Sequence, residues 1–156
     1  MSCQINIYKT DLESLSKEAL REINKMEGPV IQFCGPISTG GFGNIADNIE
    51  CISSLIKECQ IKNIFVFNQL AYERRMDQIL KEYHDYDYPL LDFFYKPILK
   101  SKKISGLVFL PLWQTSTGSK WEHDFAKSIN IPIFYLENML IKEIESFYRK
   151  ITAAIS

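Results

Sequence analysis

The sequence lacks the features that mark several classes of protein. No stretch of its 156 residues approaches the roughly 18 uninterrupted apolar residues of a membrane span, and no basic segment followed by an apolar one opens the chain. Basic residues are not in excess, because the formal net charge is −1, which argues against a nucleic-acid partner. We therefore expect a soluble cytoplasmic protein that binds neither membranes nor nucleic acid.

Signatures of bound cofactors are also missing. The four cysteines, Cys3, Cys34, Cys51 and Cys59, have neither the spacing of a metal site nor the density of a disulfide-stabilised domain, as expected of reduced thiols. The glycines in the segment 40–43 do not fit the dinucleotide-binding fingerprint, and the segment lacks the lysine of a phosphate-binding P-loop. Alternatively, these glycines serve only to permit a sharp turn of the backbone. We expect no metal, redox cofactor or nucleoside triphosphate.

What the sequence does contain is an alternation of apolar and amphipathic segments. The apolar runs predict strands at residues 30–33, 64–67, 106–110 and 131–136. Helical spacing of apolar residues predicts helices at 11–26, 44–59, 69–82, 90–100, 118–128 and 141–151. This order predicts an α/β fold, a single doubly wound domain of the flavodoxin or Rossmann type with a parallel sheet of four to five strands. Residues 1–28 would form an N-terminal helical extension, and residues 29–156 the α/β domain.

Two polar segments, 32–38 and 110–122, each follow a predicted strand and lead to a predicted helix. In open α/β sheets, ligands bind at the carboxyl ends of the strands, where backbone N–H groups are directed at them. Residues 115–119 supply four hydroxyl groups and one glycine at the start of a helix, so they could hold an anion. The alternative is plain helix capping by Ser116 or Ser119.

Glu122 brings a carboxylate into the predicted first turn of the same helix. Its spacing from Ser119 is also that of a capping box, so it either caps its own helix or acts on a ligand. A carboxylate beside an anion-binding segment indicates chemistry on a phosphorylated or sugar-bearing small molecule. We expect His123 at the surface or against a partner, since adjacent helix positions point in different directions. Trp113 and Trp121 either flank the pocket or belong to the core.

A combination of two motifs carries a family resemblance. The first is an apolar strand followed by Gly35-Pro36-Ile37-Ser38, and the second is Leu110-Pro111-x-Trp113 followed by Ser116-x-Gly118-x-x-x-Glu122, with Ala126 four residues later. These motifs resemble the nucleoside 2-deoxyribosyltransferase-like superfamily. Within it the chain is most similar to the branch that cleaves nucleoside 5′-monophosphates and to the related domain family DUF4406. The resemblance spans residues 30–136 and implies a nucleotide N-glycosidase.

The resemblance also implies which residues act on the substrate. Glu122 matches the nucleophile that attacks the anomeric carbon, and a retaining glycosyl transfer needs such a carboxylate. Ser116 matches the serine that contacts the 5′-phosphate, where transferases acting on free nucleosides have an aspartate. The other substrate-binding residues implied are Gln32, Gly35, Ile37, Ser38, Gly40, Gly41, Trp113, Gly118 and Ser119.

Other parts of the family pattern are matched less closely. Asp92 is the best match to the family's acid/base aspartate, with Asp85 and Asp87 as alternatives. Gln32 stands where the family usually has a tyrosine; a glutamine forms hydrogen bonds but lacks the acidity of a phenol. Base exchange and nucleotide binding without catalysis are the alternative functions, and the sequence leaves the base and the sugar open. The resemblance implies a homodimer or a larger homo-oligomer.

Overall fold

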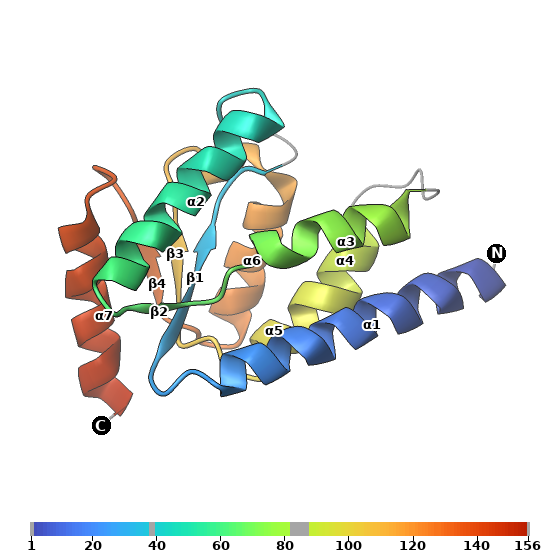
Figure 1. Cartoon of the computed structure of the whole chain (residues 1–156), viewed down its shortest axis with the longest axis horizontal. Helices are drawn as coiled ribbons and strands as arrows, with labels where there is room; N and C mark the ends of the chain where they lie inside the picture. The colour runs from blue at the N-terminus through green and yellow to red at the C-terminus, as the bar shows by residue number, and fades with distance from the viewer. Residues whose placement is uncertain (1, 38–39, 82–87, 156) are drawn as a thin grey trace.

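The computed structural model of the chain describes residues 2–37, 40–81 and 88–155. One sheet holds four parallel strands in the order β2-β1-β3-β4 (Figure 1). The strands are β1 (Val30–Cys34), β2 (Phe65–Val66), β3 (Gly106–Phe109) and β4 (Ile133–Tyr135). Every residue of the two central strands, β1 and β3, is buried, as their continuous apolar sequences predict. The predicted α/β fold with a parallel sheet is confirmed.

Helices join the strands and form the outer layers. They are α1 (Ser2–Asn24), α2 (Ile45–Ile61), α3 (Leu70–Leu80), α4 (Tyr88–Leu90), the π-helix η1 (Leu91–Tyr95), α5 (Lys96–Lys100), the 3-10 helix η2 (Trp113–Thr115), α6 (Thr117–Ser128) and α7 (Ile141–Ile155). The helix α1 starts earlier than predicted, because no glycine or proline interrupts residues 2–24. The predicted helix 90–100 is instead the succession of α4, η1 and α5. Among the described residues, no helix is both long enough and apolar enough to cross a lipid bilayer.

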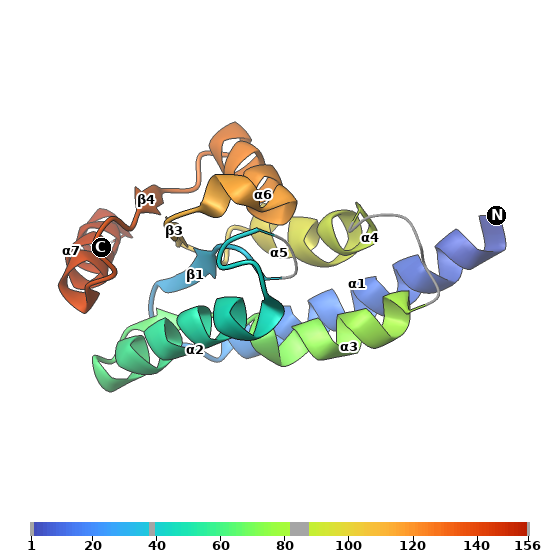
Figure 2. The ribbon, with the colours of Figure 1, turned by 90° about the horizontal axis from the view of Figure 1, so that it is seen from above.

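Side chains of β1 and β3 alternate between the two faces of the sheet. On one face, Val30, Cys34 and Phe109 join a buried cluster with apolar residues of α1, α3, η1, α5 and α6. On the other face, Ile31 and Phe33 pack with apolar residues of α2 and α7. Seen from above, α2 and α7 lie on one side of the sheet, and α5 and α6 on the other (Figure 2). This is the doubly wound arrangement.

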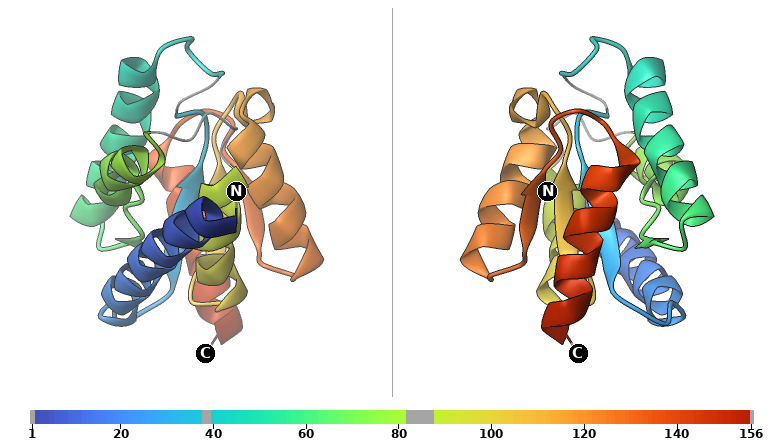
Figure 3. Two further views of the ribbon diagram at one scale, coloured as in Figure 1. Left: turned by 90° about the vertical axis from the view of Figure 1, so that its right-hand side faces the viewer. Right: turned by 90° about the vertical axis from the view of Figure 1, so that its left-hand side faces the viewer.

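The helices α1 and α3 pack side by side and extend away from the sheet (Figures 1 and 2). Arg75 of α3 forms two hydrogen bonds with the carboxylate of Glu18 on α1, at 2.8 and 2.9 Å. Ser16 of α1 is buried and donates a hydrogen bond to the backbone oxygen of Phe94 in η1 (3.0 Å). These contacts hold α3 and η1 against α1. The side views show the loop before α2 and the start of α6 at the same end of the sheet (Figure 3).

Candidate functional site

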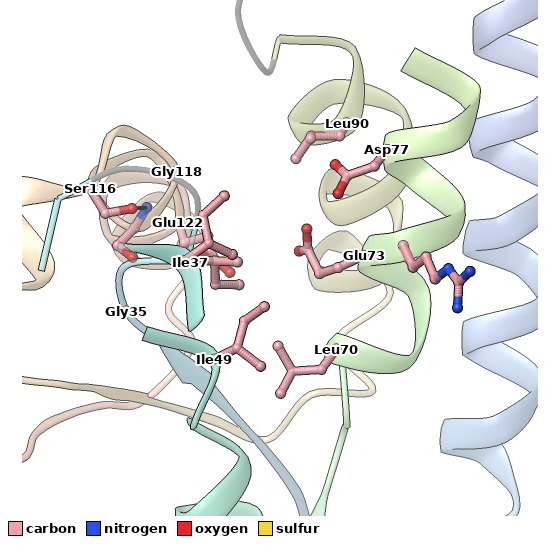
Figure 4. A pocket seen from close by; sticks show the side chains of 13 residues that line it. Gly35, Ile37, Ile49, Leu70, Glu73, Asp77, Leu90, Ser116, Gly118 and Glu122 are labelled. Carbon is pink, nitrogen blue, oxygen red and sulfur yellow. Dashed lines mark hydrogen bonds between the residues drawn. The ribbon is translucent and has the colours of Figure 1, made fainter. Parts of the chain in front are cut away.

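A cavity of about 270 Å³ lies at the carboxyl ends of β1 and β3, between α6 and α3 (Figure 4). Six residues that the sequence assigned to the site line it together, from two segments far apart in the chain: Gly35, Ile37, Ser116, Gly118, Ser119 and Glu122. The remaining lining residues come from α2, α3 and α4: Ile45, Ile49, Leu70, Glu73, Arg74, Asp77 and Leu90. The location is the one where open α/β sheets bind their ligands.

Glu122 presents its carboxyl group at this cavity from the second turn of α6, because the helix begins at Thr117. The side chain is only 7% exposed, and Oε2 accepts a hydrogen bond from Nε2 of Gln32 at 2.5 Å. The thiol of Cys34 forms a further hydrogen bond with Glu122. Gln32 and Cys34 are two residues apart on β1, so both side chains face α6. The carboxyl group of Glu122 therefore forms hydrogen bonds with side chains of β1 and does not cap its own helix.

The environment of Glu122 changes its acidity. The pKa of the Glu122 carboxyl is raised to about 8, and burial is the largest cause. Hydrogen bonds from Cys34 and Gln32 lower this pKa, whereas the charge of Glu73 raises it further. At pH 7 the protonated form of Glu122 therefore predominates. Burial, together with the charge of Glu122, raises the pKa of the Cys34 thiol well above its usual value, so this thiol stays a protonated donor. The ionised form of Glu122 increases as the pH rises through about 8.

The start of α6 forms a second feature of the cavity. Ser116 caps the helix, since its hydroxyl oxygen accepts a hydrogen bond from the backbone N–H of Ser119 at 3.2 Å. Capping therefore accounts for the hydroxyl of Ser116. It does not account for Ser119, whose side chain is 1% exposed and whose hydroxyl has no hydrogen-bond partner within the described part of the chain. A buried hydroxyl beside the first N–H groups of a helix is suited to hold an anionic ligand.

The glycine-rich loop takes a structural role at the edge of the site. Gly40 and Gly41 do not line the cavity. The N–H of Gly41 donates to the hydroxyl of Thr115 at 2.8 Å, and this bond joins the loop before α2 to the 3-10 helix η2. Both glycines have positive φ, and a Cβ at Gly41 would lie 2.5 Å from the side-chain oxygen of Asn48. The loop therefore supports the segments that carry the site residues. Ser38 lies outside the described residues.

The wall opposite Glu122 contains residues that the sequence analysis did not single out. Glu73 and Asp77, on successive turns of α3, point into the cavity (Figure 4). The buried hydroxyl of Tyr95 donates to Oε1 of Glu73 at 2.5 Å. Burial raises the pKa of Tyr95 well above its usual value, as do the charges of Glu73 and Glu122. The spacing of two acidic residues by one helical turn was the available signal in the sequence, whereas nothing there oriented Tyr95.

The predicted acid/base aspartate is not part of this wall. Asp92 lies in η1 and is not among the residues that line the cavity. The alternatives Asp85 and Asp87 lie outside the described residues. Within the described part of the chain, the carboxylates that line the cavity together with Glu122 are therefore those of α3.

The aromatic residues near the second motif form a separate cluster. Trp113 is not among the cavity-lining residues and stacks on His123, with ring centroids 4.4 Å apart. The prediction of a surface histidine is wrong, because His123 faces β3 and β4: it is buried, and its Nε2 lies 2.6 Å from the hydroxyl of Tyr135. Trp121 is half-buried and stacks on Phe125 at 5.2 Å.

Comparisons with protein-family models, with curated proteins and with solved structures found no match to this chain. The class that fold and site define is a doubly wound α/β domain with a buried carboxyl group at the ligand-binding edge of its sheet. The family resemblance of the two motifs stays a prediction.

Proposed function

We propose that the chain is a nucleotide N-glycosidase, which hydrolyses the N-glycosidic bond of a (deoxy)ribonucleoside 5′-monophosphate. The observation that carries the proposal is the Glu122 carboxyl group, buried at the cavity and hydrogen-bonded to Gln32. Ser116, Gly118 and Ser119 line the same cavity from the start of α6, where the helix dipole favours a phosphate. The proposal places the 5′-phosphate there and C1′ of the sugar beside Glu122.

The proposed reaction has two displacement steps at C1′. First, a carboxylate oxygen of Glu122 attacks C1′ as the C1′–N bond breaks, and the electron pair of that bond leaves with the base, which takes up a proton. Then water attacks C1′, the ester bond to Glu122 breaks, and the products are a sugar 5-phosphate and the free base. The family resemblance assigns the proton donor to Asp92, which does not line this cavity, with Asp85 and Asp87, outside the described residues, as alternatives. If a second base takes the place of water, the same residues perform base exchange.

Nucleotide binding without catalysis is the second candidate function. The observation that favours it is the pKa of about 8 of Glu122, which leaves most molecules without the nucleophilic carboxylate at pH 7. In the enzyme, the positive charge that develops on the sugar in the transition state favours the ionised form of Glu122. In a binding protein, the protonated carboxyl would instead serve as a hydrogen-bond donor to the ligand.

Glu122→Ala separates these candidates when turnover and nucleotide-dependent thermal stabilisation are both measured. An enzyme loses turnover and is still stabilised by the monophosphate. A binding protein shows no turnover before the substitution and is stabilised by nucleotide before and after it. Absence of stabilisation in both the wild type and the variant would contradict both functions.

We propose a cytoplasmic homodimer or larger homo-oligomer, as the family resemblance implies. Phe42 (63% exposed) and Leu112 (49% exposed) border an apolar hollow of about 150 Å³ at the same edge of the sheet. In the proposed assembly a second copy of the chain would cover these exposed apolar side chains. Light scattering after size-exclusion chromatography tests it, and a monomer at micromolar concentration would contradict it.

A further inference from the structure

The proposed reaction needs a group that gives a proton to the departing base, and the residue matched to that role does not line the cavity. This inference rests on the proposed function, in which a carboxylate oxygen of Glu122 attacks C1′ from the side opposite the base. Asp92 lies in η1, outside the cavity lining, whereas α3 stands across the cavity from Glu122 (Figure 4). A proton donor that acts on the base therefore belongs on α3.

Two carboxyl groups of α3 point into the cavity, and their surroundings differ. Glu73 is half-buried, and the buried hydroxyl of Tyr95 donates a hydrogen bond to its Oε1. Tyr95 is in turn packed edge-on against Phe94, with ring centroids 4.8 Å apart. Asp77 lies one helical turn further along α3 and is exposed. A general acid must be held close to the atom that it protonates, and this favours Glu73.

Glu73 and Glu122 also interact through their charges. The charge of Glu73 raises the pKa of Glu122, and the charges of both raise the pKa of Tyr95. Because such interactions are reciprocal, ionisation of Glu122 favours a proton on Glu73. The reaction needs one ionised carboxylate and one carboxylic acid across the cavity, and a single proton shared by this pair supplies that state. Arg74, the next residue of α3, also lines the cavity, but a guanidinium does not give up a proton.

We propose that Glu73 is the general acid and base of the glycosidase, in place of Asp92. In the first step Glu73 gives its proton to the base as the C1′–N bond breaks, and the electron pair of that bond stays with the base. In the second step Glu73, now a carboxylate, takes a proton from the water whose oxygen bonds to C1′, while the ester bond to Glu122 breaks. Glu73 is then protonated again, and each turnover consumes one water. Tyr95 is a positioning residue, since it holds Oε1 of Glu73.

Two leaving groups separate a proton donor from a residue that only shapes the cavity. Guanine leaves guanosine 5′-monophosphate with a proton, whereas the base of 7-methylguanosine 5′-monophosphate is already cationic and departs without one. Glu73→Gln removes the acidic proton and keeps an oxygen that accepts the hydrogen bond from Tyr95. This variant should release guanine at least about 100-fold more slowly than the wild type, the usual scale of general acid catalysis. Its first turnover of the 7-methyl nucleotide should stay within about threefold of the wild-type rate.

The second step provides an independent measurement on the same variant. With the 7-methyl nucleotide, Glu73→Gln should release one equivalent of base in a burst and then slow down, because no carboxylate takes the proton of the attacking water. The sugar ester on Glu122 should then be detectable by intact mass spectrometry. Added azide, a nucleophile that needs no deprotonation, should restore turnover.

Glu137→Gln, at an exposed glutamate outside the cavity, is the matched control and should leave both rates unchanged. Equal losses on both substrates in Glu73→Gln, or the expected pattern in Asp92→Asn or Asp77→Asn instead, would overturn this inference and leave the proposed function standing. A wild type that cleaves other monophosphates but not the 7-methyl nucleotide would also contradict it, because a base that needs no proton leaves more easily. Release of no base from any monophosphate would overturn both together.

Discussion

Nε2 of Gln32 lies 2.5 Å from Oε2 of Glu122, and this contact joins β1 to α6 at the cavity. The residues are 90 positions apart in the chain, so the sheet and the helix must both be in place before the contact forms. The pKa of about 8 of Glu122 is a balance between burial and such hydrogen bonds. Gln32 therefore helps to set the fraction of Glu122 that is ionised at neutral pH.

Replacement of Gln32 by methionine keeps the volume similar and removes the donor. We predict that the pKa of Glu122 rises above about 8, because a hydrogen bond to the ionised form is lost. The rise of turnover with pH should shift to higher pH, and the rate at pH 7 should fall several-fold. A pH–rate profile measures both effects.

The matched control is Gln69→Met, which removes another buried glutamine whose Nε2 donates to the backbone oxygen of Phe33 at 2.6 Å. This variant should lose stability without a shift of the profile. If Gln32→Met left the profile in place, the assigned role of the Gln32–Glu122 hydrogen bond would be wrong.

Glu122 should make the protein less stable as the pH rises. Its pKa is about 8 in the folded chain and 4.5 without burial, so between these values the folded state binds the proton more tightly than the unfolded state. The contribution of Glu122 to the unfolding free energy is therefore fully present below about pH 4.5. It is lost as the pH rises toward 8, a loss of about a few kcal/mol. Glu122→Gln should remove this loss. Urea unfolding at pH 5 and pH 8.5 compares the wild type with this variant. An identical decline of stability in both would contradict the raised pKa of Glu122.

Ser119 should contribute to binding and not to folding. Because its buried hydroxyl has no partner in the described structure, Ser119→Ala is expected to leave stability unchanged or slightly raised. The KM for the monophosphate should rise about tenfold, the scale of one hydrogen bond to a charged group. Ser128→Ala on the same helix is the control, since its exposed hydroxyl bonds the backbone oxygen of Phe125. A similar KM change in both variants would argue against a phosphate contact at Ser119.

The glycine loop should be more sensitive to alanine at one position than at another. Gly41 and Gly43 both have positive φ, so alanine strains the backbone at either site by about 1–2 kcal/mol. At Gly41 the new Cβ would also lie 2.5 Å from Asn48 and 2.7 Å from Pro36, whereas at Gly43 no atom lies within 4 Å. We predict that Gly41→Ala lowers the unfolding free energy by at least about 1 kcal/mol more than Gly43→Ala. Equal losses in chemical denaturation would contradict this steric difference.

The sheet could be predicted from the sequence because its central strands are short, nearly continuous apolar runs. The buried strands β1 and β3 fall where residues 30–33 and 106–110 predicted them. The π-helix η1 was missed, since residues 90–100 have ordinary helical spacing and a π-turn has no pattern of its own in one sequence.

The candidate site was predictable on one side only. Glu122 and Ser119 follow a strand within a recognisable motif, so they could be placed at the carboxyl edge of the sheet. Glu73 and Tyr95 belong to helices whose orientation depends on packing against α1, and no local spacing encodes that orientation. His123 was misplaced because the side of α6 that faces β3 and β4 depends on where the helix crosses the sheet.

The most direct test of the account is release of free base from nucleotides. The purified protein is incubated with ribo- and deoxyribonucleoside 5′-monophosphates and with the matching nucleosides, and free base is detected by chromatography at pH 7 and pH 8.5. The account predicts release from monophosphates, more at the higher pH, and none after Glu122→Gln. No release from any monophosphate, or release that survives Glu122→Gln, would contradict a glycosidase that acts through Glu122.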